Sequence, residues 1–223
     1  MNRIPLSKRT LPDYTRGEEI FHMVSHIVGA AAGVIVLGLC LFFSIVRQNG
    51  WGMVAGIIYG LSFIQLYTIS SLYHGLRPGM AKRVLQVIDH CTIYLFIAGS
   101  YTPIMLVALR PVYPGWAWGI LGAVWGLAAL AIVLNAIDLK RFKVFSMVCY
   151  MGMGWCVMIG IKPVMETVAI AGLRLLVAGG VVYTIGAVLY GLGRKKRYMH
   201  ALFHLCCVMG SVLQALCILL YVL

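Results

Sequence analysis

Residues 20–46 read IFHMVSHIVGAAAGVIVLGLCLFFSIV, an apolar run that contains no Asp, Glu, Lys or Arg. A membrane-spanning helix needs about 20 such residues, because a rise of ~1.5 Å per residue must cross ~30 Å of hydrocarbon. The run is longer than the ~7–15 apolar residues of a secretory signal peptide. It therefore predicts a retained first transmembrane helix, preceded by a short N-terminal segment, residues 1–19.

The rest of the chain has the same character. Of its 223 residues, 62% are hydrophobic and 11% are charged, whereas a soluble domain carries about 25% charged residues. This composition excludes a soluble enzyme, a disordered chain and a disulfide scaffold. We predict an all-α polytopic membrane protein in which residues 20–223 form a single seven-helix transmembrane domain, with no room for a second, soluble domain.

Glycine, proline and clustered charges divide the chain into seven predicted helices. Their expected ranges are 20–46, 51–75, 84–109, 115–136, 142–161, 171–192 and 198–222. Three pairs of glycines are spaced four residues apart, either for close helix approach or as small residues facing lipid: Gly29/Gly33, Gly56/Gly60 and Gly122/Gly126. The seven cysteines all fall within apolar runs, which favours small buried side chains over disulfides.

The basic residues predict an orientation. Of the 18 Lys and Arg residues, 14 lie in the N-terminal segment and in the connections after the second, fourth and sixth helices. Because Lys and Arg accumulate on the cytoplasmic side, we expect a cytoplasmic N-terminus and an extracytoplasmic C-terminus. The net charge of +12 then predicts contact with anionic membrane lipids rather than with nucleic acid.

Ionisable residues inside the spans lie near the predicted cytoplasmic ends of their helices. Such residues are costly in a membrane and are functional candidates by default. At ~1.5 Å per residue they are all within roughly 5–10 Å of the basic loops, so several helices can bring them to one level. They are His22, His26, His74, Asp89, His90, His200 and His204.

Three of these histidines predict a metal site. His200 and His204 are four residues apart, so both imidazoles project from one face of a helix, and His74 lies at a matching depth. Three neutral imidazoles make a tetrahedral Zn²⁺ site with one position left for water. The alternative for each histidine is a helix cap or a hydrogen bond to a carbonyl group.

Two further residues are predicted beside this zinc. A carboxylate close to a catalytic zinc can accept the proton of the attacking water, and Asp89 is the candidate for that role. Ser70 precedes His74 by one helical turn and could hydrogen-bond to a ligand, or else to its own helix. His90 projects about 100° away from Asp89 around their helix and is left out of the site.

Other side chains leave alternatives open. His22 and His26 form a second pair four residues apart, which could hold a second metal or supply an alternative ligand. The adjacent Glu18 and Glu19 are explained by the positive end of the helix dipole alone. Thiolates also bind zinc, but Cys206 and Cys207 lie off the histidine face of the last helix.

Five motifs, in order, resemble one known family. They are Glu18-Glu19 with His26, Ser70-Ser71-Leu72-Tyr73-His74, Asp89-His90-Cys91-Thr92-Ile93-Tyr94, Ala98-Gly99-Ser100-Tyr101-Thr102-Pro103, and His200-x3-His204. From about Glu18 to the C-terminus, the chain is similar to the hemolysin III family, the bacterial branch of the progestin and adipoQ receptor (PAQR) proteins. One departure is His22, where the bacterial branch is expected to have Asn.

The resemblance implies seven helices with a cytoplasmic N-terminus in the bacterial inner membrane. It implies zinc bound by His74, His200 and His204, with Ser70 and Asp89 beside the metal. It also groups the chain with alkaline ceramidases as membrane-embedded, metal-dependent hydrolases, and with proteins linked to membrane fluidity and lipid homeostasis.

Three functions compete at this point. The first is a zinc hydrolase acting on an amide or ester of a membrane lipid, with Asp89 as the general base. The second is a sensor or regulator of lipid state with a structural zinc. The third is a transporter or pore, which ranks last because it needs polar groups through both halves of the membrane. The name of the resembled family also implies a cytolysin.

Overall fold

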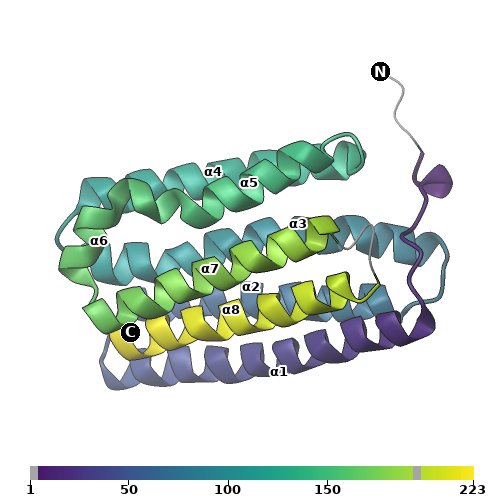
Figure 1. Ribbon diagram of the computed structural model, residues 1–223. Helices are drawn as coiled ribbons and strands as arrows, with labels where there is room; N and C mark the ends of the chain where they lie inside the picture. The colour runs from purple at the N-terminus through teal and green to yellow at the C-terminus, as the bar shows by residue number, and fades with distance from the viewer. Residues whose placement is uncertain (1–4, 193–196) are drawn as a thin grey trace.

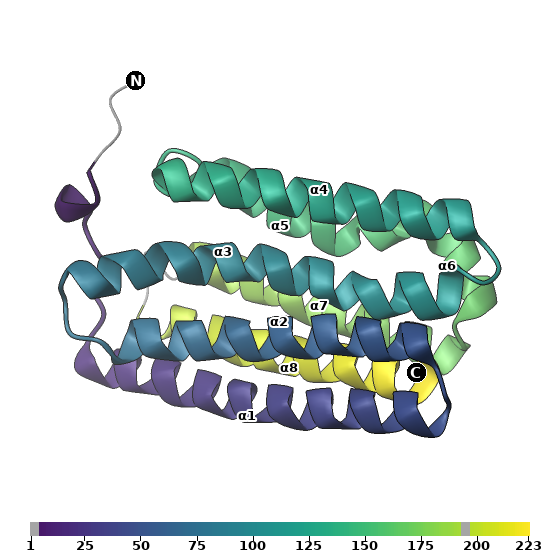
Figure 2. The same ribbon diagram turned by 180° about the vertical axis from the view of Figure 1, so that it is seen from behind.

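The computed structural model describes residues 5–192 and 197–223. Within these residues, seven helical spans are long and apolar enough to cross a membrane, which confirms the predicted all-α fold. The helices run roughly side by side. Helix α1 begins at one end of the bundle, and α8 finishes at the other (Figures 1 and 2). The spans are α1 Arg16–Val46, α2 Gly50–Gly75, α3 Met80–Pro103 with its extension η2 Ile104–Leu109, α4 Pro114–Asp138, α5 Lys143–Trp155 with η3 Cys156–Gly160 and α6 Ile161–Thr167, α7 Ile170–Leu192, and α8 Met199–Tyr221.

Helix α1 begins at Arg16 instead of the expected residue 20. Its first turn is held by a capping box: the Glu18 amide donates to the Thr15 hydroxyl (3.3 Å), and the Glu18 carboxylate accepts from the Thr15 amide (2.9 Å). The Thr-x-x-Glu pattern is a known start signal for helices, and it was available in the sequence. The consequence is that Glu18 and Glu19 lie on the helix, four and three residues before His22.

The fifth span is longer than expected. The sequence predicted a connection from Lys162 to Ile170, but α6 continues as helix through Thr167, so that part of the prediction is wrong. Pro163 is the reason that the pattern misled: it lies in the first turn of α6, where a missing backbone N–H interrupts no helical hydrogen bond.

The structure shows which glycine pairs allow close helix approach and which are small residues at the surface of the bundle. A Cβ atom on Gly29 would lie 2.5 Å from the ring of Tyr67, and one on Gly60 would lie 2.7 Å from a leucine side chain of α1. Glycine is therefore required where α1 and α2 pack together. At Gly122 and Gly126 of α4, a Cβ atom would meet nothing within 4 Å, so those residues lie at the periphery of the bundle.

The segment before α1 crosses the end of the bundle. The Arg9 guanidinium donates to the carbonyl of Ile137 at the end of α4 (3.1 Å), and the carbonyl of Arg9 accepts from Arg83 of α3 (3.0 Å). These contacts hold the segment over the ends of α3 and α4 and direct the chain toward α1.

The predicted orientation in the membrane stays a prediction, because the helices alone do not show which end faces the cytoplasm. Four of the basic residues on which it depends, Arg3, Arg194, Lys195 and Lys196, lie outside the described residues.

Candidate metal centre

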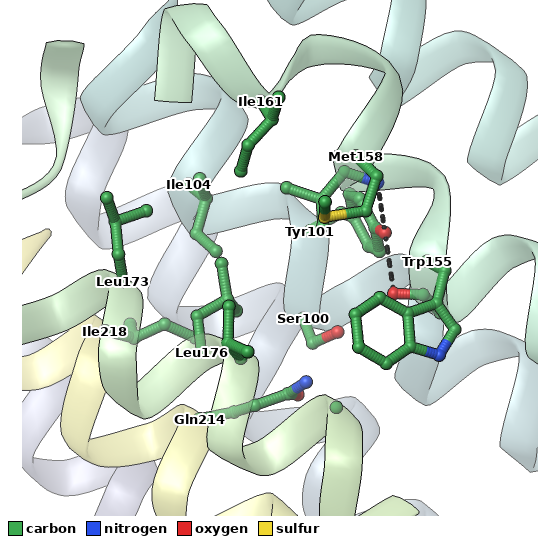
Figure 3. Close-up of a pocket in the computed structure, with 14 residues that line it drawn as sticks. Ser100, Tyr101, Ile104, Trp155, Met158, Ile161, Leu173, Leu176, Gln214 and Ile218 are labelled. Atoms are coloured by element: carbon green, nitrogen blue, oxygen red, sulfur yellow. Dashed lines mark hydrogen bonds between the residues drawn. The ribbon is translucent and has the colours of Figure 1, made fainter. Parts of the chain in front are cut away.

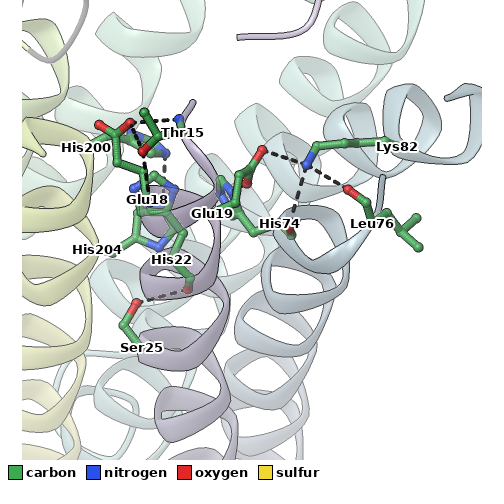
Figure 4. Close-up of polar contacts among 10 residues, drawn as sticks. All are labelled: Thr15, Glu18, Glu19, His22, Ser25, His74, Leu76, Lys82, His200 and His204. Carbon is green, nitrogen blue, oxygen red and sulfur yellow. Dashed lines mark hydrogen bonds and ion pairs between the residues drawn. The ribbon is translucent and has the colours of Figure 1, made fainter. Parts of the chain in front are cut away.

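Four histidines from three helices meet at the end of the bundle where α1 begins (Figure 4). One ring nitrogen from each lies within 4.8 Å of the corresponding nitrogens of the other three, and the four residues are His22 of α1, His74 of α2, and His200 and His204 of α8. We call them the four-histidine cluster. It brings together the three histidines predicted as ligands and adds His22, for which the sequence left open a second metal site or a role as an alternative ligand.

Three of the four histidines are buried, His200 is half-buried, and the cluster is short of hydrogen-bond partners. His22 is fully buried, and neither of its ring nitrogens has a partner; Nδ1 of His204 is also buried without one. A buried polar atom without a partner costs roughly 1–3 kcal/mol. Neutral imidazole nitrogens are ligands that Zn²⁺ prefers, and each of the four rings offers one nitrogen, so the donor set fits a metal ion that would give the His22 ring a partner.

The two histidines of α8 already have the spacing of shared ligands. Their Nε2 atoms lie 3.1 Å apart. Two nitrogens bound to one tetrahedral zinc at ~2.0–2.1 Å are roughly 3.3 Å from each other. The four-residue spacing on one helix therefore supplies a pair that needs little movement to bind a metal.

A carboxylate orients His74. The Nδ1 atom of His74 lies 2.6 Å from Oε2 of Glu19, and Oε1 of Glu19 accepts a hydrogen bond from the ammonium group of Lys82 at 2.7 Å. Lys82 is held in turn by the carbonyl of Leu76 in the α2–α3 connection (3.0 Å). A metal-binding histidine commonly donates its second nitrogen to a carboxylate, which fixes the ring and makes it a better ligand. Sequence reasoning missed this role of Glu19, because nothing local links residue 19 to residue 74.

Glu18 joins the first turn of α1 to the start of α8. Its Oε1 accepts from the backbone amide of Tyr198 at 2.9 Å, the residue just before α8, which has a positive φ of 62°. This link between distant parts of the chain places the beginning of α1 beside that of α8. His22 and His200 follow these two anchored positions within about one helical turn.

Tyr14 covers the cluster. Its ring stacks on that of His200, with centroids 5.0 Å apart and planes 10° apart, and it meets the ring of His22 edge-on at 5.0 Å. Burial, followed by nearby Tyr190 and the carboxylates of Glu19 and Glu18, raises the pKa of Tyr14 well above its usual range. The phenol is therefore neutral near pH 7 and remains a hydrogen-bond donor.

Asp89 lies outside the cluster. Its side chain shares a hydrogen bond with that of Ser70, which joins α3 to the helix that carries His74. The structure thus brings Asp89 and Ser70 together but does not place Asp89 among the grouped ligand atoms. His90 bonds through Nδ1 to the carbonyl of Gln86 (2.8 Å), the alternative use foreseen for a lone histidine.

The remaining candidates also lie outside the cluster. His26, one turn beyond His22, stacks on His204 with centroids 3.9 Å apart, but it does not belong to the group. Cys206 and Cys207 are free thiols, likewise outside it. The pair formed by His22 and His26 in the sequence is therefore divided, and only its first member joins the other ligands.

A small cavity elsewhere in the bundle makes a useful contrast (Figure 3). It has a volume of about 40 Å³ and is lined by residues of α3, η3, α7 and α8, including Tyr101 and Gln214. The Tyr101 hydroxyl donates to the carbonyl of Met153 (2.7 Å) and accepts from the amide of Val157 (2.9 Å). The Tyr101 hydroxyl therefore has partners within the protein, whereas the ring nitrogens of His22 have none.

The chain matches the family model described as Haemolysin-III related over residues 14–215. It is 34% identical over 206 residues to Hemolysin-3 of Bacillus cereus, covering 92% of each chain. It is 33% identical over 208 residues to a Hemolysin-3 homolog of Bacillus subtilis (strain 168), covering 93% of this chain and 96% of the relative. A more distant relative is the human Monocyte to macrophage differentiation factor, 28% identical over 163 residues, with 70% of this chain and 65% of the relative covered. No solved structure matches the chain significantly.

Proposed function

The chain belongs to the haemolysin III-related family and is a multi-pass membrane protein, and from this premise we propose that it is a zinc-dependent hydrolase of a membrane-lipid amide or ester. Its proposed location is the bacterial inner membrane, and its proposed partners are the membrane lipids themselves. The family membership and the resemblance to metal-dependent membrane hydrolases point the same way.

The observation that carries this proposal is the four-histidine cluster, in which both ring nitrogens of His22 and Nδ1 of His204 are buried without a hydrogen-bond partner. His74, His200 and His204 would hold the ion, with Glu19 orienting His74. Zn²⁺ bound there would supply Lewis acidity, which polarises a carbonyl group and lowers the pKa of water. The protein contributes a fixed ligand set, enclosed by α1, α2 and α8, at one end of a membrane-spanning bundle.

Asp89 is the proposed proton acceptor. The hydrogen bond between Asp89 and Ser70 holds the carboxylate against α2, one turn from His74. General-base catalysis contributes typically 10²–10⁴-fold to a rate. Asp89→Asn retains the shape and removes the basicity, so we expect zinc to remain bound while hydrolysis falls by roughly that factor.

A second candidate, a lipid-state sensor with a structural zinc, is favoured by one specific observation. Four imidazoles are enough to fill a tetrahedral coordination sphere. In that case zinc would join α1, α2 and α8, and its binding energy would count as folding energy.

One experiment separates the candidates. The protein is purified in detergent, its zinc is measured, and it is reconstituted in vesicles that contain ceramide and phosphatidylcholine as amide and ester substrates. One zinc per chain, with turnover that is lost in Asp89→Asn, supports the hydrolase. Zinc without turnover supports the structural role, and undiminished turnover in Asp89→Asn removes Asp89 from the mechanism. Dye release from the same vesicles tests the cell lysis that the names of the Bacillus relatives imply.

The proposed orientation has its own test. A reporter fused after Leu223 should read as extracytoplasmic, because most basic residues lie on the N-terminal side. A cytoplasmic reading would reverse the orientation and move the four-histidine cluster to the outer face.

A further inference from the structure

We infer that His22 is a fourth metal ligand, so that the resting metal centre is closed by four imidazoles and opens only when His22 leaves it. The inference rests on the metal binding of the proposed function and adds a statement about how access to the metal is controlled. A site with three protein ligands has a standing position for water, whereas a site with four does not.

The first argument is geometric. Four atoms at most 4.8 Å from one another lie within about 2.9 Å of their common centre, so each would move inward by less than ~1 Å to reach a Zn–N distance of ~2.0–2.1 Å. Rotations of the side chains can supply such a movement. His22 meets this condition together with the three predicted ligands.

The second argument is that the ring of His22 has no other use among the described residues. It is fully buried, and both ring nitrogens lack a hydrogen-bond partner. Its nearest rings are those of His74 (4.6 Å between centroids), His200 (4.7 Å) and His204 (4.7 Å). A polar ring is costly to bury in this way, and a metal ion among these four rings would remove much of that cost.

Comparison with His26 shows that burial alone does not define the ligand. His26 lies one turn along α1, is also buried, and also has two unpartnered nitrogens. Its ring nevertheless lies flat against His204, 3.9 Å away, and it does not join the group of ligand atoms. The two histidines are therefore a matched pair, of which only His22 is placed to bind the metal.

The surrounding charges agree with an all-imidazole ligand set. Four neutral imidazoles leave the full charge of a divalent ion in place, so compensation has to come from outside the ligands. Glu19 touches His74, and Glu18 lies one turn before His22. Lys82 offsets part of this negative charge through its ion pair with Glu19. Together these three side chains contribute one net negative charge, which compensates half of the charge of a divalent ion.

Cobalt provides the test, because the visible spectrum of Co²⁺ reports its ligands without any activity measurement. The full-length protein in detergent is loaded with Co²⁺ and titrated with azide, in wild type, His22→Asn and His26→Asn. An amide is shorter than an imidazole and a poorer ligand for the metal, so His22→Asn should open one position. We expect a saturable azide shift in His22→Asn, and no shift in the wild type or in His26→Asn.

The wild-type titration needs no variant to fold and can overturn the inference by itself. A wild-type spectrum that shifts with azide, or a His22→Asn spectrum identical to the wild type before and after azide, means that His22 is not a ligand. If the protein binds neither cobalt nor zinc, this inference and the proposed metal-dependent function are both wrong. If four imidazoles hold the metal but the protein shows no turnover, only the hydrolase proposal is wrong.

Discussion

The hairpin of α1 and α2 and the hairpin of α4 and α5 look alike in the sequence but differ in the structure. Both pairs are long apolar helices joined by short connections, and both contain glycines four residues apart. In the first hairpin the glycines lie where the other helix leaves no space for a side chain. In α4, a Cβ atom added to Gly122 or Gly126 would have no neighbouring atom within 4 Å. The same spacing therefore marks an interface in one place and a lipid-facing surface in the other.

Their buried polar residues differ in the same way. In the second hairpin, the hydroxyl of Ser146 donates to Oδ1 of Asn135 at 2.6 Å, a contact made between α4 and α5 themselves. In the first, the ring nitrogens of His22 have no hydrogen-bond partner, and the ring lies among histidines of α2 and α8. Polar groups that bond within a hairpin stabilise the fold, whereas polar groups that converge without partners indicate a binding site.

The largest expected effect is a loss of zinc binding, which should distinguish the histidines of the cluster from polar residues that bond within a hairpin. His204→Ala or His200→Ala should abolish most zinc binding, because the loss of one imidazole leaves a poor site. Both variants should also lose the stabilisation that zinc gives, which is about 2.7 kcal/mol when zinc is present at 100 times its dissociation constant. Zinc content and thermal unfolding with and without a chelator measure the two effects. Asn135→Leu and His90→Ala should keep their zinc; equal loss in all variants would indicate general unfolding and remove the distinction.

Glu19 tests whether the cluster depends on its supporting carboxylate. Glu19→Gln keeps a polar side chain beside His74 but removes the charge that orients and activates the ring, and we expect zinc affinity to fall by about 10–100-fold. Competition with a chromophoric chelator measures the affinity. Glu166→Gln, an exposed residue of α6, is the control and should bind zinc as the wild type does. Unchanged affinity in Glu19→Gln would mean that the contact with His74 is incidental.

The glycines give a direct test of the two hairpins. Gly29→Ala places a Cβ atom against the ring of Tyr67 and should destabilise the protein by about 1–3 kcal/mol, as overpacking usually does. Gly126→Ala meets no neighbouring atom and should be neutral or slightly stabilising. Thermal unfolding in detergent compares the two. Similar losses at both positions would show that α4 is as closely packed as α1 and α2.

The smallest effect is expected at Tyr14. Its stacking on His200 should contribute about 0.5–1.5 kcal/mol, the usual value for an aromatic pair. Tyr14→Ala should lose this stabilisation, and Tyr14→Phe should retain it, since the ring remains. Unfolding of the two variants in the presence of zinc measures the difference. A loss in Tyr14→Phe as large as in Tyr14→Ala would assign the effect to the hydroxyl group instead of the ring.

The sequence by itself determined the seven helices. In a lipid bilayer each backbone N–H and C=O must be satisfied within its own segment, so an apolar run of sufficient length folds as a helix whatever its neighbours are. The errors were at the ends of helices, at Arg16, at Met80 and between Lys162 and Thr167, where the polar surroundings no longer force this outcome. Periodicity also aligned His200 with His204, because four residues on one helix fix the relation of two side chains.

Only the tertiary structure decided which of the remaining polar residues meet. The depth of a residue along a helix follows from counting, and depth was enough to propose His74. The rotation of each helix about its axis and the choice of its neighbours depend on packing between distant segments, such as Gly29 against Tyr67 and Glu18 against the start of α8. That packing separates His22 from His26, leaves Asp89 with Ser70 outside the grouped ligand atoms, and places Glu19 on His74. None of these relations has a local cause in the chain.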